Sequence, residues 1–352
     1  MNIWIICLEK IDGRYTQQWY YNIPRLIEDK ARKNGVNVNV VTVDGAEIPQ
    51  TTTEGAFLDF ASTNYYKASQ AMAVSKLFMD GKVKAGDKFL VTDGWNFVIT
   101  PIKYMSELLG IPVEIHSIFH AGAYDPSDIL GMKMSRWASD AERSWFYASD
   151  YSYFATEFHR SMFLRNLNID AEYHNRAVRS GQPHDPIIDQ LTAHLDTPKK
   201  KRVMWPHRYN SDKQPEIAEA LGKTFEFVIT QKMNLSKEEY YRELGSSQVI
   251  FSCSLHENLG ISMMEATLAG CIPVLPNRCS YSEMYEHEFL YPSVWTSSVE
   301  NFKKYRKEIE NFIRHRLEHP EQYENAMKRQ RERLIRDYLN ADIMIDKLLK
   351  WF

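Results

Sequence analysis

Residues 248–278 read QVIFSCSLHENLGISMMEATLAGCIPVLPNR, and the order of elements in this stretch decides the fold. Residues 249–251 are a short apolar run with high β-propensity, which predicts a strand. From Ile261 the apolar positions recur at helical spacing, and Gly270 predicts the end of that helix. A further apolar run at 272–275 predicts a second strand. The stretch is therefore a strand, a loop, a helix and a strand in succession, as in α/β folds.

Two glutamates flank the start of this predicted helix. Glu257 lies in the loop before it, and Glu265 lies eight positions later, inside the helix. The first turn of a helix presents unpaired backbone N–H groups and the positive end of a dipole, which suits a phosphate. Gly260 permits close approach of the backbone there. The pattern predicts a phosphate-containing ligand whose hydroxyls donate to both carboxylates. The alternative is a buried crossover that happens to carry two glutamates.

Length and composition narrow the class of protein. A chain of 352 residues favours two domains, and 44% hydrophobic with 25% charged residues is typical of a soluble globular protein. The four cysteines lack CxxC spacing, so we expect reduced core residues and no zinc site. No apolar run approaches the roughly 20 residues of a membrane span. The N-terminal run fits a buried strand better than a signal peptide. We expect a cytoplasmic protein with no membrane partner.

The rest of the chain alternates predicted strands and helices, which favours an α/β fold with two Rossmann-like domains. In the first half the predicted strands are 2–8, 36–43, 87–92, 112–119 and 151–155, and the predicted helices are 17–33, 64–80, 99–109 and 135–149. The second half adds strands 202–205 and 225–230 and helices 213–221 and 236–245 before the opening unit. The predicted division is a first domain 1–185, a linker 186–201, a second domain 202–325 and a final helix 326–352 that returns to the first domain.

The paired glutamates resemble the motif of retaining GT-B glycosyltransferases, in which two Rossmann-like domains face each other across a cleft. The resemblance implies that Glu257 holds the donor sugar and that Glu265 holds the nucleotide ribose. Arg208 and Lys213, which follow the predicted strand 202–205, match the family's cations for the donor diphosphate. The backbone amides of Leu259, Gly260 and Ile261 complete that site. Because two fixed cations can neutralise the leaving diphosphate, the resemblance implies neither a metal nor another cofactor.

Longer stretches carry two more specific resemblances. WPHRYNSDKQPE and SLHENLGISMMEATLAGCIPVLPNR resemble the queuosine-tRNA mannosyltransferase-like family. GRYTQQW, GAFLDFASTNYYK, VTDGW and HAGAYDPSD resemble glycosyltransferases of tailed bacteriophages that modify hydroxymethylated pyrimidines in DNA. They imply an enzyme that transfers a sugar from a nucleotide sugar, UDP-linked by expectation, to 5-hydroxymethylcytosine in double-stranded DNA. The alternatives are transfer to a modified nucleoside in tRNA, and a non-catalytic GT-B module that only binds its ligands.

The resemblance also assigns candidates in the first domain, where ligands of such sheets bind at the carboxyl ends of strands. His120 matches the active-site histidine of the family, and Gly13 is the single glycine where many members have several. Asp93 and Asp125 are candidates for the acceptor hydroxyl, although each could instead cap its own loop. The remaining acceptor candidates are Arg14, Tyr15, Trp95 and Tyr124, with Trp19 as a further aromatic that could stack on a base. Basic clusters at 199–202 and 328–336 could contact phosphates, although such runs are more often solvated faces.

Overall fold

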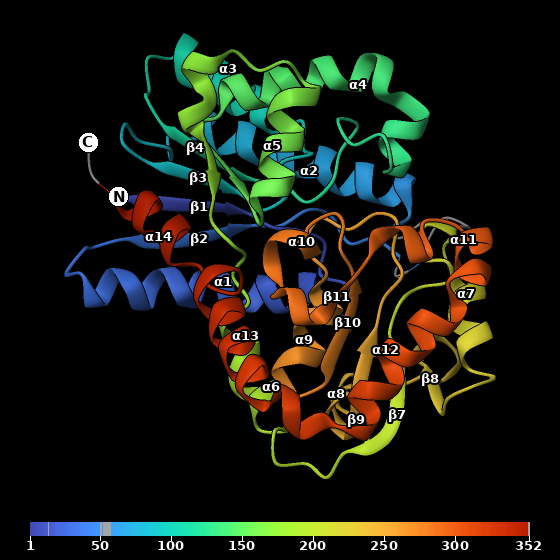
Figure 1. The fold of residues 1–352 in the computed structure, drawn as a ribbon. Helices are drawn as coiled ribbons and strands as arrows, with labels where there is room; N and C mark the ends of the chain where they lie inside the picture. The colour runs from blue at the N-terminus through green and yellow to red at the C-terminus, as the bar shows by residue number, and fades with distance from the viewer. Residues whose placement is uncertain (13, 50, 52–57, 351–352) are drawn as a thin grey trace. The chain divides into compact units, whose positions relative to one another are not determined.

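The computed structural model describes residues 1–12, 14–49, 51 and 58–350. Contacts within the chain divide it into two compact units (Figure 1). Unit 1 comprises Met1–Pro183 together with the segment that begins at Asn340, and unit 2 comprises His184–Leu339. Each unit has its own parallel sheet with helices packed on it, so the predicted α/β class with two Rossmann-like units is confirmed.

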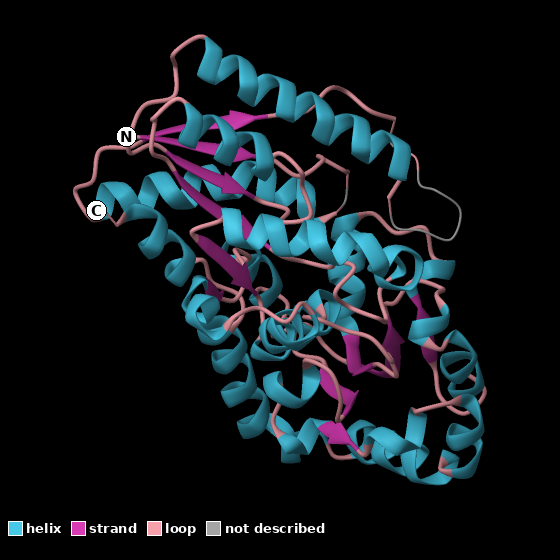
Figure 2. Cartoon of the chain, turned by 90° about the horizontal axis from the view of Figure 1, so that it is seen from above, coloured by secondary structure: helices cyan, strands magenta, loops and turns pink. Residues whose placement is uncertain are grey.

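The sheet of unit 1 has six strands in the order β2-β1-β3-β4-β5-β6, all parallel. Its strands are β1 (Asn2–Ile6), β2 (Asn39–Val43), β3 (Lys88–Val91), β4 (Glu114–Ile118), β5 (Tyr151–Phe154) and β6 (Ala177–Arg179). Its helices are α1 (Tyr15–Lys33), α2 (Phe60–Met79), α3 (Ile99–Leu108), α4 (Ile129–Ala148), α5 (Glu157–Asn166) and α14 (Asp342–Leu349), with a 3-10 turn η1 (Ala171–Arg176). In Figure 2 the strands fan out from the N-terminus with helices on both sides.

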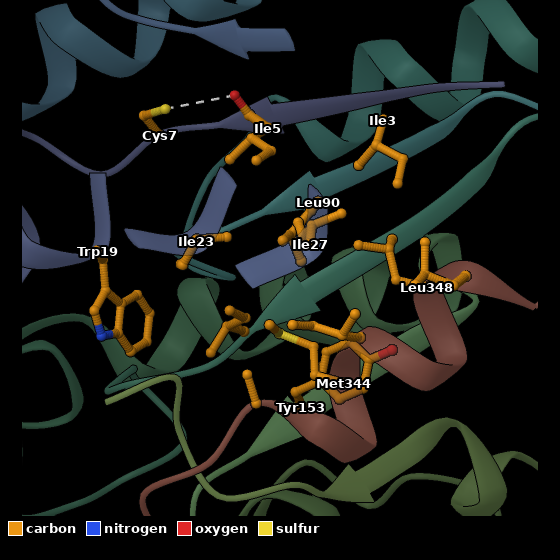
Figure 3. Packing of buried hydrophobic residues seen from close by; sticks show 14 of the residues in the cluster. Ile3, Ile5, Cys7, Trp19, Ile23, Ile27, Leu90, Tyr153, Met344 and Leu348 are labelled. Carbon is orange, nitrogen blue, oxygen red and sulfur yellow. Dashed lines mark hydrogen bonds between the residues drawn. The ribbon is translucent and has the colours of Figure 1, made fainter. Parts of the chain in front are cut away.

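Side chains of β1 alternate between two cores, as the pleat of a strand requires. Ile3 and Ile5 pack with α1 and α14 on one face of the sheet, as Figure 3 shows. Trp4 and Ile6 pack with α2 and α3 on the other face. Because both faces are covered, β1 and β3 carry continuous apolar runs at residues 3–6 and 89–91. The central strand β4 instead buries Glu114, His116 and Ser117 among its apolar residues.

The helix α14 belongs to unit 1, although it is far from the other elements of that unit in the sequence. Met344 and Leu348 lie in the same core as Ile27 of α1 (Figure 3). Lys30 of α1 adds ion pairs to α14, with its Nζ 2.7 Å from Oδ1 of Asp342. Trp351 and Phe352, the last residues of the predicted final helix, lie outside the described residues.

The sheet of unit 2 has five parallel strands in the order β11-β10-β9-β7-β8. They are β7 (Lys200–Trp205), β8 (Phe227–Ile229), β9 (Ser247–Phe251), β10 (Ile272–Pro276) and β11 (Leu290–Tyr291). The helices are α6 (Asp185–Thr192), α7 (Pro215–Leu221), α8 (Lys237–Ser246), α9 (Ile261–Leu268), α10 (Tyr281–Met284), α11 (Val299–Lys304), α12 (Arg306–Glu318) and α13 (Glu324–Asp337). The 3-10 turns are η2 (Ser211–Lys213), η3 (Thr230–Lys232), η4 (His287–Phe289), η5 (Ser293–Thr296) and η6 (Pro320–Tyr323).

The observed boundaries differ from the predicted ones at two places. Much of the predicted linker 186–201 is the helix α6, because Ile187 and Leu191 are one turn apart and both buried. The helix α13, predicted to return to the first domain, lies in unit 2. Gln330 of α13 is fully buried there, and its amide donates to the carbonyl of Met284 at 3.0 Å.

Candidate active site

The two charged motifs of unit 2 meet at one edge of its sheet. Strands β7 and β9 are parallel neighbours, so the loops that follow them lie side by side. Lys213 Nζ lies 3.3 Å from Oε2 of Glu257 and donates to the carbonyl of His256 at 2.6 Å. Residues 44 positions apart in the sequence are therefore joined by an ion pair. Arg208 lies in the same loop as Lys213, and its side chain is exposed.

The loop that carries Glu257 is fixed by its own backbone. Oε1 of Glu257 accepts a hydrogen bond from the N–H of Gly260 at 2.9 Å. Gly260 precedes α9 with φ of +78°, and a Cβ there would lie 2.8 Å from the ring of Tyr281. A side chain at this position would be both strained and too close. Three backbone amides were predicted to bind the diphosphate. One of them, the N–H of Gly260, already donates to Glu257. Leu259 is buried and Ile261 begins α9.

Burial and charge shift the pKa values of Glu257 and Lys213 in opposite directions. Burial alone would raise the pKa of Glu257, but nearby groups, with the Lys213 ammonium first among them, together outweigh it, so the pKa of the carboxyl lies below its ordinary value. Burial would likewise lower the pKa of Lys213, but Glu257 and Asp212 outweigh it and raise that pKa. Both groups are therefore charged at neutral pH, and the ammonium is held at the start of α9.

His207 is a site residue that the sequence analysis did not identify. It is buried at the end of β7, and its Nε2 lies 2.9 Å from Oγ of Ser252. Burial, together with the nearby Lys213 ammonium, lowers the pKa of His207 to about 3. The imidazole is therefore neutral. Its position directly before Arg208 was the available signal, but a lone histidine at a strand end has many roles.

Glu265 occupies a separate pair further along α9. Its side chain is buried, and Oε1 accepts from Lys237 Nζ at 2.8 Å and from Tyr241 OH at 3.3 Å. Burial would lower the pKa of Lys237, but Glu265 and Tyr241 outweigh it and raise that pKa. The sequence predicted the helix that carries Lys237 and Tyr241 without linking either residue to Glu265. A bound ribose would share or replace these contacts.

In unit 1, His120 follows β4 and both of its ring nitrogens have partners. Nε2 lies 2.8 Å from the carbonyl oxygen of Thr92, which makes this nitrogen the donor. Nδ1 lies 3.4 Å from the amide nitrogen of Gln182. Burial lowers the pKa of His120, with Asp93 opposing it, so the ring is neutral. The geometry positions the imidazole; it does not leave a nitrogen ready to take a proton.

Asp93 is paired with a lysine that the sequence analysis did not single out. Oδ2 of Asp93 lies 2.6 Å from Nζ of Lys67, which also donates to the carbonyl of Trp95 at 2.7 Å. Oδ1 accepts from the N–H of Trp95 at 3.1 Å, so Asp93 also caps its own loop. Trp95 packs edge-on against Trp145 and is partly buried against the core of unit 1.

Two of the aromatic candidates for base stacking are core residues, which corrects that expectation. Tyr124 is 2% exposed, and its hydroxyl hydrogen-bonds Nε2 of His159. Trp19 is also 2% exposed and lies in the core beneath α1. Both sit in loops or helix starts that predict exposure from sequence alone, but each fills space against other rings. Asp125 is buried as well, and its Oδ1 accepts from the N–H of Ser127 at 2.9 Å, as a loop-capping aspartate does.

The loop that contains Tyr124 is held by a buried glutamate of α4. Glu142 accepts hydrogen bonds from the N–H of Ala123 at 2.5 Å and of Tyr124 at 2.9 Å. A Cβ at Gly122 would lie 2.4 Å from Oε1 of Glu142, so the loop passes too close for any side chain. Burial raises the pKa of Glu142 to about 7, although the two N–H groups oppose it.

The remaining candidates of unit 1 lie at the start of α1. Tyr15 is half-buried, and its ring centroid lies 5.8 Å from that of His120. Arg14 precedes α1 and lines a small cavity of about 70 Å³ with Asp59 and Thr63. Gly13 lies outside the described residues, as do 55–57 of the stretch GAFLDFASTNYYK.

Several residues of the basic clusters proposed for phosphate contacts have partners within unit 2. Lys199 donates to the carbonyls of Gly245 and Ala269 at 2.6 Å each. Arg202 is buried and pairs with Glu243. In the second cluster, internal partners bind Arg329, through Glu286, and Arg333, through the carbonyl of Glu283. Part of this charge therefore stabilises the fold, while Lys200, Lys201, Lys328 and Arg336 are exposed.

The described residues include neither a cluster arranged to hold a metal nor a helix that could span a membrane. No group of three or more His, Cys, Asp or Glu side chains is arranged to hold a metal ion in the described parts of the chain. None of the described helices is long and apolar enough to cross a membrane. The four cysteines are free, and three of them are buried.

Comparison with known proteins gives a partial match in sequence and a match in fold. No family model matches the sequence. A tRNA-queuosine alpha-mannosyltransferase of Drosophila melanogaster is 26% identical over 147 residues, an alignment that covers 32% of this chain and 39% of that protein. The chain thus matches well under half the length of this curated relative.

Solved structures match over nearly the whole chain at low identity. A sucrose-phosphate synthase of Thermosynechococcus elongatus has a TM-score of 0.61 at 12% identity and covers 99% of this chain and 97% of its own. A trehalose 6-phosphate synthase of Burkholderia multivorans has a TM-score of 0.59 at 13% identity, with the same coverage. The catalytic domain of starch synthase IV of Arabidopsis thaliana, bound to ADP and acarbose, has a TM-score of 0.54 at 12% identity over 99% of this chain and 97% of its own. The fold is GT-B, which confirms the predicted fold class.

Proposed function

We propose that this chain is a glycosyltransferase that takes a sugar from a nucleotide-sugar donor bound by unit 2. The observation that carries the proposal is the Lys213–Glu257 pair at the start of α9, with Glu265 buried two turns further along the same helix. A cation and a helix N-terminus at one point suit a diphosphate, and carboxylates on either side suit sugar and ribose hydroxyls. The GT-B fold agrees with this arrangement.

The proposed chemistry follows from the charges. As the glycosidic bond breaks, negative charge grows on the leaving diphosphate, and Lys213 with the exposed Arg208 would stabilise it. Glu257 would orient the sugar, and Glu265 would accept from the ribose in place of Lys237. We propose transfer with retention, in which the departing phosphate takes the proton of the acceptor. No metal or other cofactor enters this scheme, because the two cations carry the charge.

The acceptor we propose first is the hydroxyl of 5-hydroxymethylcytosine in double-stranded DNA. Its support is the resemblance of four stretches in unit 1 to phage enzymes. Part of each basic cluster has partners within unit 2, which lowers the number of lysines and arginines available for phosphates. We therefore expect weak binding of unmodified DNA with a shallow salt dependence, about 0.9 in log K per phosphate contact.

A second candidate acceptor is a modified nucleoside in tRNA. The observation that favours it is the 26% identity to a tRNA-queuosine alpha-mannosyltransferase. That match covers a third of this chain, so it supports a shared donor site as readily as a shared acceptor.

One experiment separates these candidates. The protein is incubated with UDP-, GDP- and ADP-sugars and with hydroxymethylated DNA, plain DNA or queuosine-containing tRNA, and products are read by mass spectrometry. One sugar per modified base, and none on plain DNA, is the expected result. Transfer to tRNA alone would establish the second candidate. Nucleotide binding without transfer or donor hydrolysis would indicate a binding module and contradict the proposed activity.

A further inference from the structure

Three segments of unit 2 meet at a small group of buried carbonyl oxygens beside the candidate donor site. They are the loop that carries Lys213, the loop that leads to Glu257, and the turn η5. The carbonyls of Cys253 and Thr296 lie at the centre, and each accepts from two different side chains. Nothing in the proposed mechanism uses these side chains directly.

The first of them is Arg278, which follows β10. Its Nη2 donates to the carbonyls of Cys253 at 2.9 Å and of Thr296 at 3.0 Å. Its Nε donates to the carbonyl of Ser254 at 2.7 Å, and Nη1 donates to that of Ser293 at 3.0 Å. A planar guanidinium is suited to this task, because its N–H groups diverge in one plane toward several acceptors. A lysine could not reach the same set.

The second is Gln214, the residue directly after Lys213. Its side-chain nitrogen donates to the same two carbonyls, to Cys253 at 2.6 Å and to Thr296 at 2.7 Å. Gln214 is buried and holds a left-handed conformation with φ of 52°, which is uncommon for a residue with a side chain. The left-handed conformation of Gln214 is held because its side-chain amide donates two hydrogen bonds. The backbone that carries Lys213 is thereby tied to the loop that carries Glu257.

We propose that Arg278 and Gln214 are positioning residues that set the separation of Lys213 and Glu257 for transfer. The inference rests on the proposed function. Cys253 and Ser254 lie four and three positions before Glu257, so a shift of their carbonyls moves its carboxylate. The pair of charges must align with a diphosphate and a sugar at once, and small misplacements are costly in catalysis. We call the hydrogen bonds of Arg278 and Gln214 to the carbonyls of Cys253 and Thr296 the brace. Loss of the brace should therefore lower kcat more than it raises KM.

The test compares Arg278→Lys and Gln214→Ala with a matched control, Arg306→Lys. Arg306 of α12 also donates to a carbonyl, that of Ala220 at 3.2 Å, but takes no part in the brace. The expected result is a fall in kcat of about ten- to hundredfold, with KM for the donor changed by less than about threefold, for both brace variants. The control keeps wild-type kcat. Added guanidinium should partly restore an Arg278→Ala variant, which a merely structural role would not predict.

A second measurement does not depend on turnover. Hydrogen exchange of the Gly260 amide, which donates to Glu257, reports whether the loop is held. Arg278→Lys should speed exchange over 253–260 and leave β9 protected. Wild-type kcat together with unchanged exchange would overturn the brace. If the wild-type protein turns over no donor, faster exchange in Arg278→Lys would still support the brace while the proposed function fails.

Discussion

The strand-end loops of the two units use charge in opposite ways. In unit 2, Lys213 and Glu257 come from the loops of neighbouring strands and pair with each other at the edge of the sheet. In unit 1, Asp93 pairs with Lys67, which comes from the middle of a helix and is almost fully buried. The proposed function requires the first pair to exchange its partners for a ligand. The second holds a loop in place, and a ligand could not take it over without exposing a buried charge.

In the proposed function, the Lys213–Glu257 pair contacts a ligand and the Lys67–Asp93 pair shapes the site. A charged pair that joins two loops at a sheet edge is suited to binding. A charged pair that joins a loop to a helix is suited to support. The four predictions below test this distinction, from the largest expected effect to the smallest.

The largest effect should come from Lys67→Met in unit 1. The substitution leaves Asp93 without its partner at a site where both side chains are mostly buried. Breaking such a pair costs about 3–5 kcal/mol of the free energy of unfolding, measured by urea denaturation. Lys103→Met is the control, since its pair with Glu107 is exposed and contributes below about 0.5 kcal/mol. Equal losses in the two variants would refute a supporting role for Lys67.

Lys213→Ala tests the binding side of the comparison. The ammonium stabilises charge that develops on the diphosphate, so its removal should slow donor turnover about 100- to 1,000-fold. Steady-state kinetics with the preferred nucleotide sugar provide the measurement. Lys200→Ala, at the amino end of β7 and exposed, is the matched control and should keep its rate. A variant at position 213 that turns over donor at the wild-type rate would remove Lys213 from the site.

Glu265→Ala should act on binding more than on rate. Ribose contacts are the same before and during the reaction, so their loss weakens nucleotide affinity by about ten- to hundredfold, or about 1.5–3 kcal/mol. Calorimetric titration with UDP and ADP gives the affinities. The exposed Glu308 of α12 provides the control, Glu308→Ala. A fall in kcat with unchanged affinity would instead give Glu265 a role in the transition state.

The smallest effect should come from Glu142→Gln, as a change in how the free energy of unfolding depends on pH. The pKa of Glu142 is raised by burial from 4.5 to about 7 in the folded state, so folding favours the protonated form. Its stabilising contribution is complete below pH 4.5 and is lost as the pH rises through about 7. The slope is at most about 1.4 kcal/mol per pH unit. Urea unfolding at several pH values should show a flatter profile for Glu142→Gln, and parallel profiles would contradict the assignment.

The sequence predicted the fold because the spacing of apolar residues carries that information. The resemblance to GT-B enzymes named the donor-side candidates, whose roles stay predictions. Parallel strands bring successive loops to one edge, which agrees with the pairing of Lys213 and Glu257. The partners were not predictable in the same way. Lys237 reaches Glu265, and Lys67 reaches Asp93, from helices whose rotation about their axes depends on packing. Tyr124 follows a strand as an exposed ligand contact would, yet it fills a core of aromatic rings.

The path of the chain through unit 1 has a consequence for synthesis. The helix α14 covers a core made by β1 and α1, but all of unit 2 is translated between them. Unit 2 is one continuous segment and has its complete set of strands as soon as it leaves the ribosome. Until α14 emerges, the core around Ile23 and Ile27 lacks the side chains of Met344, Ile345 and Leu348. The nascent chain therefore exposes the apolar surface that α14 later covers, and such surface favours aggregation.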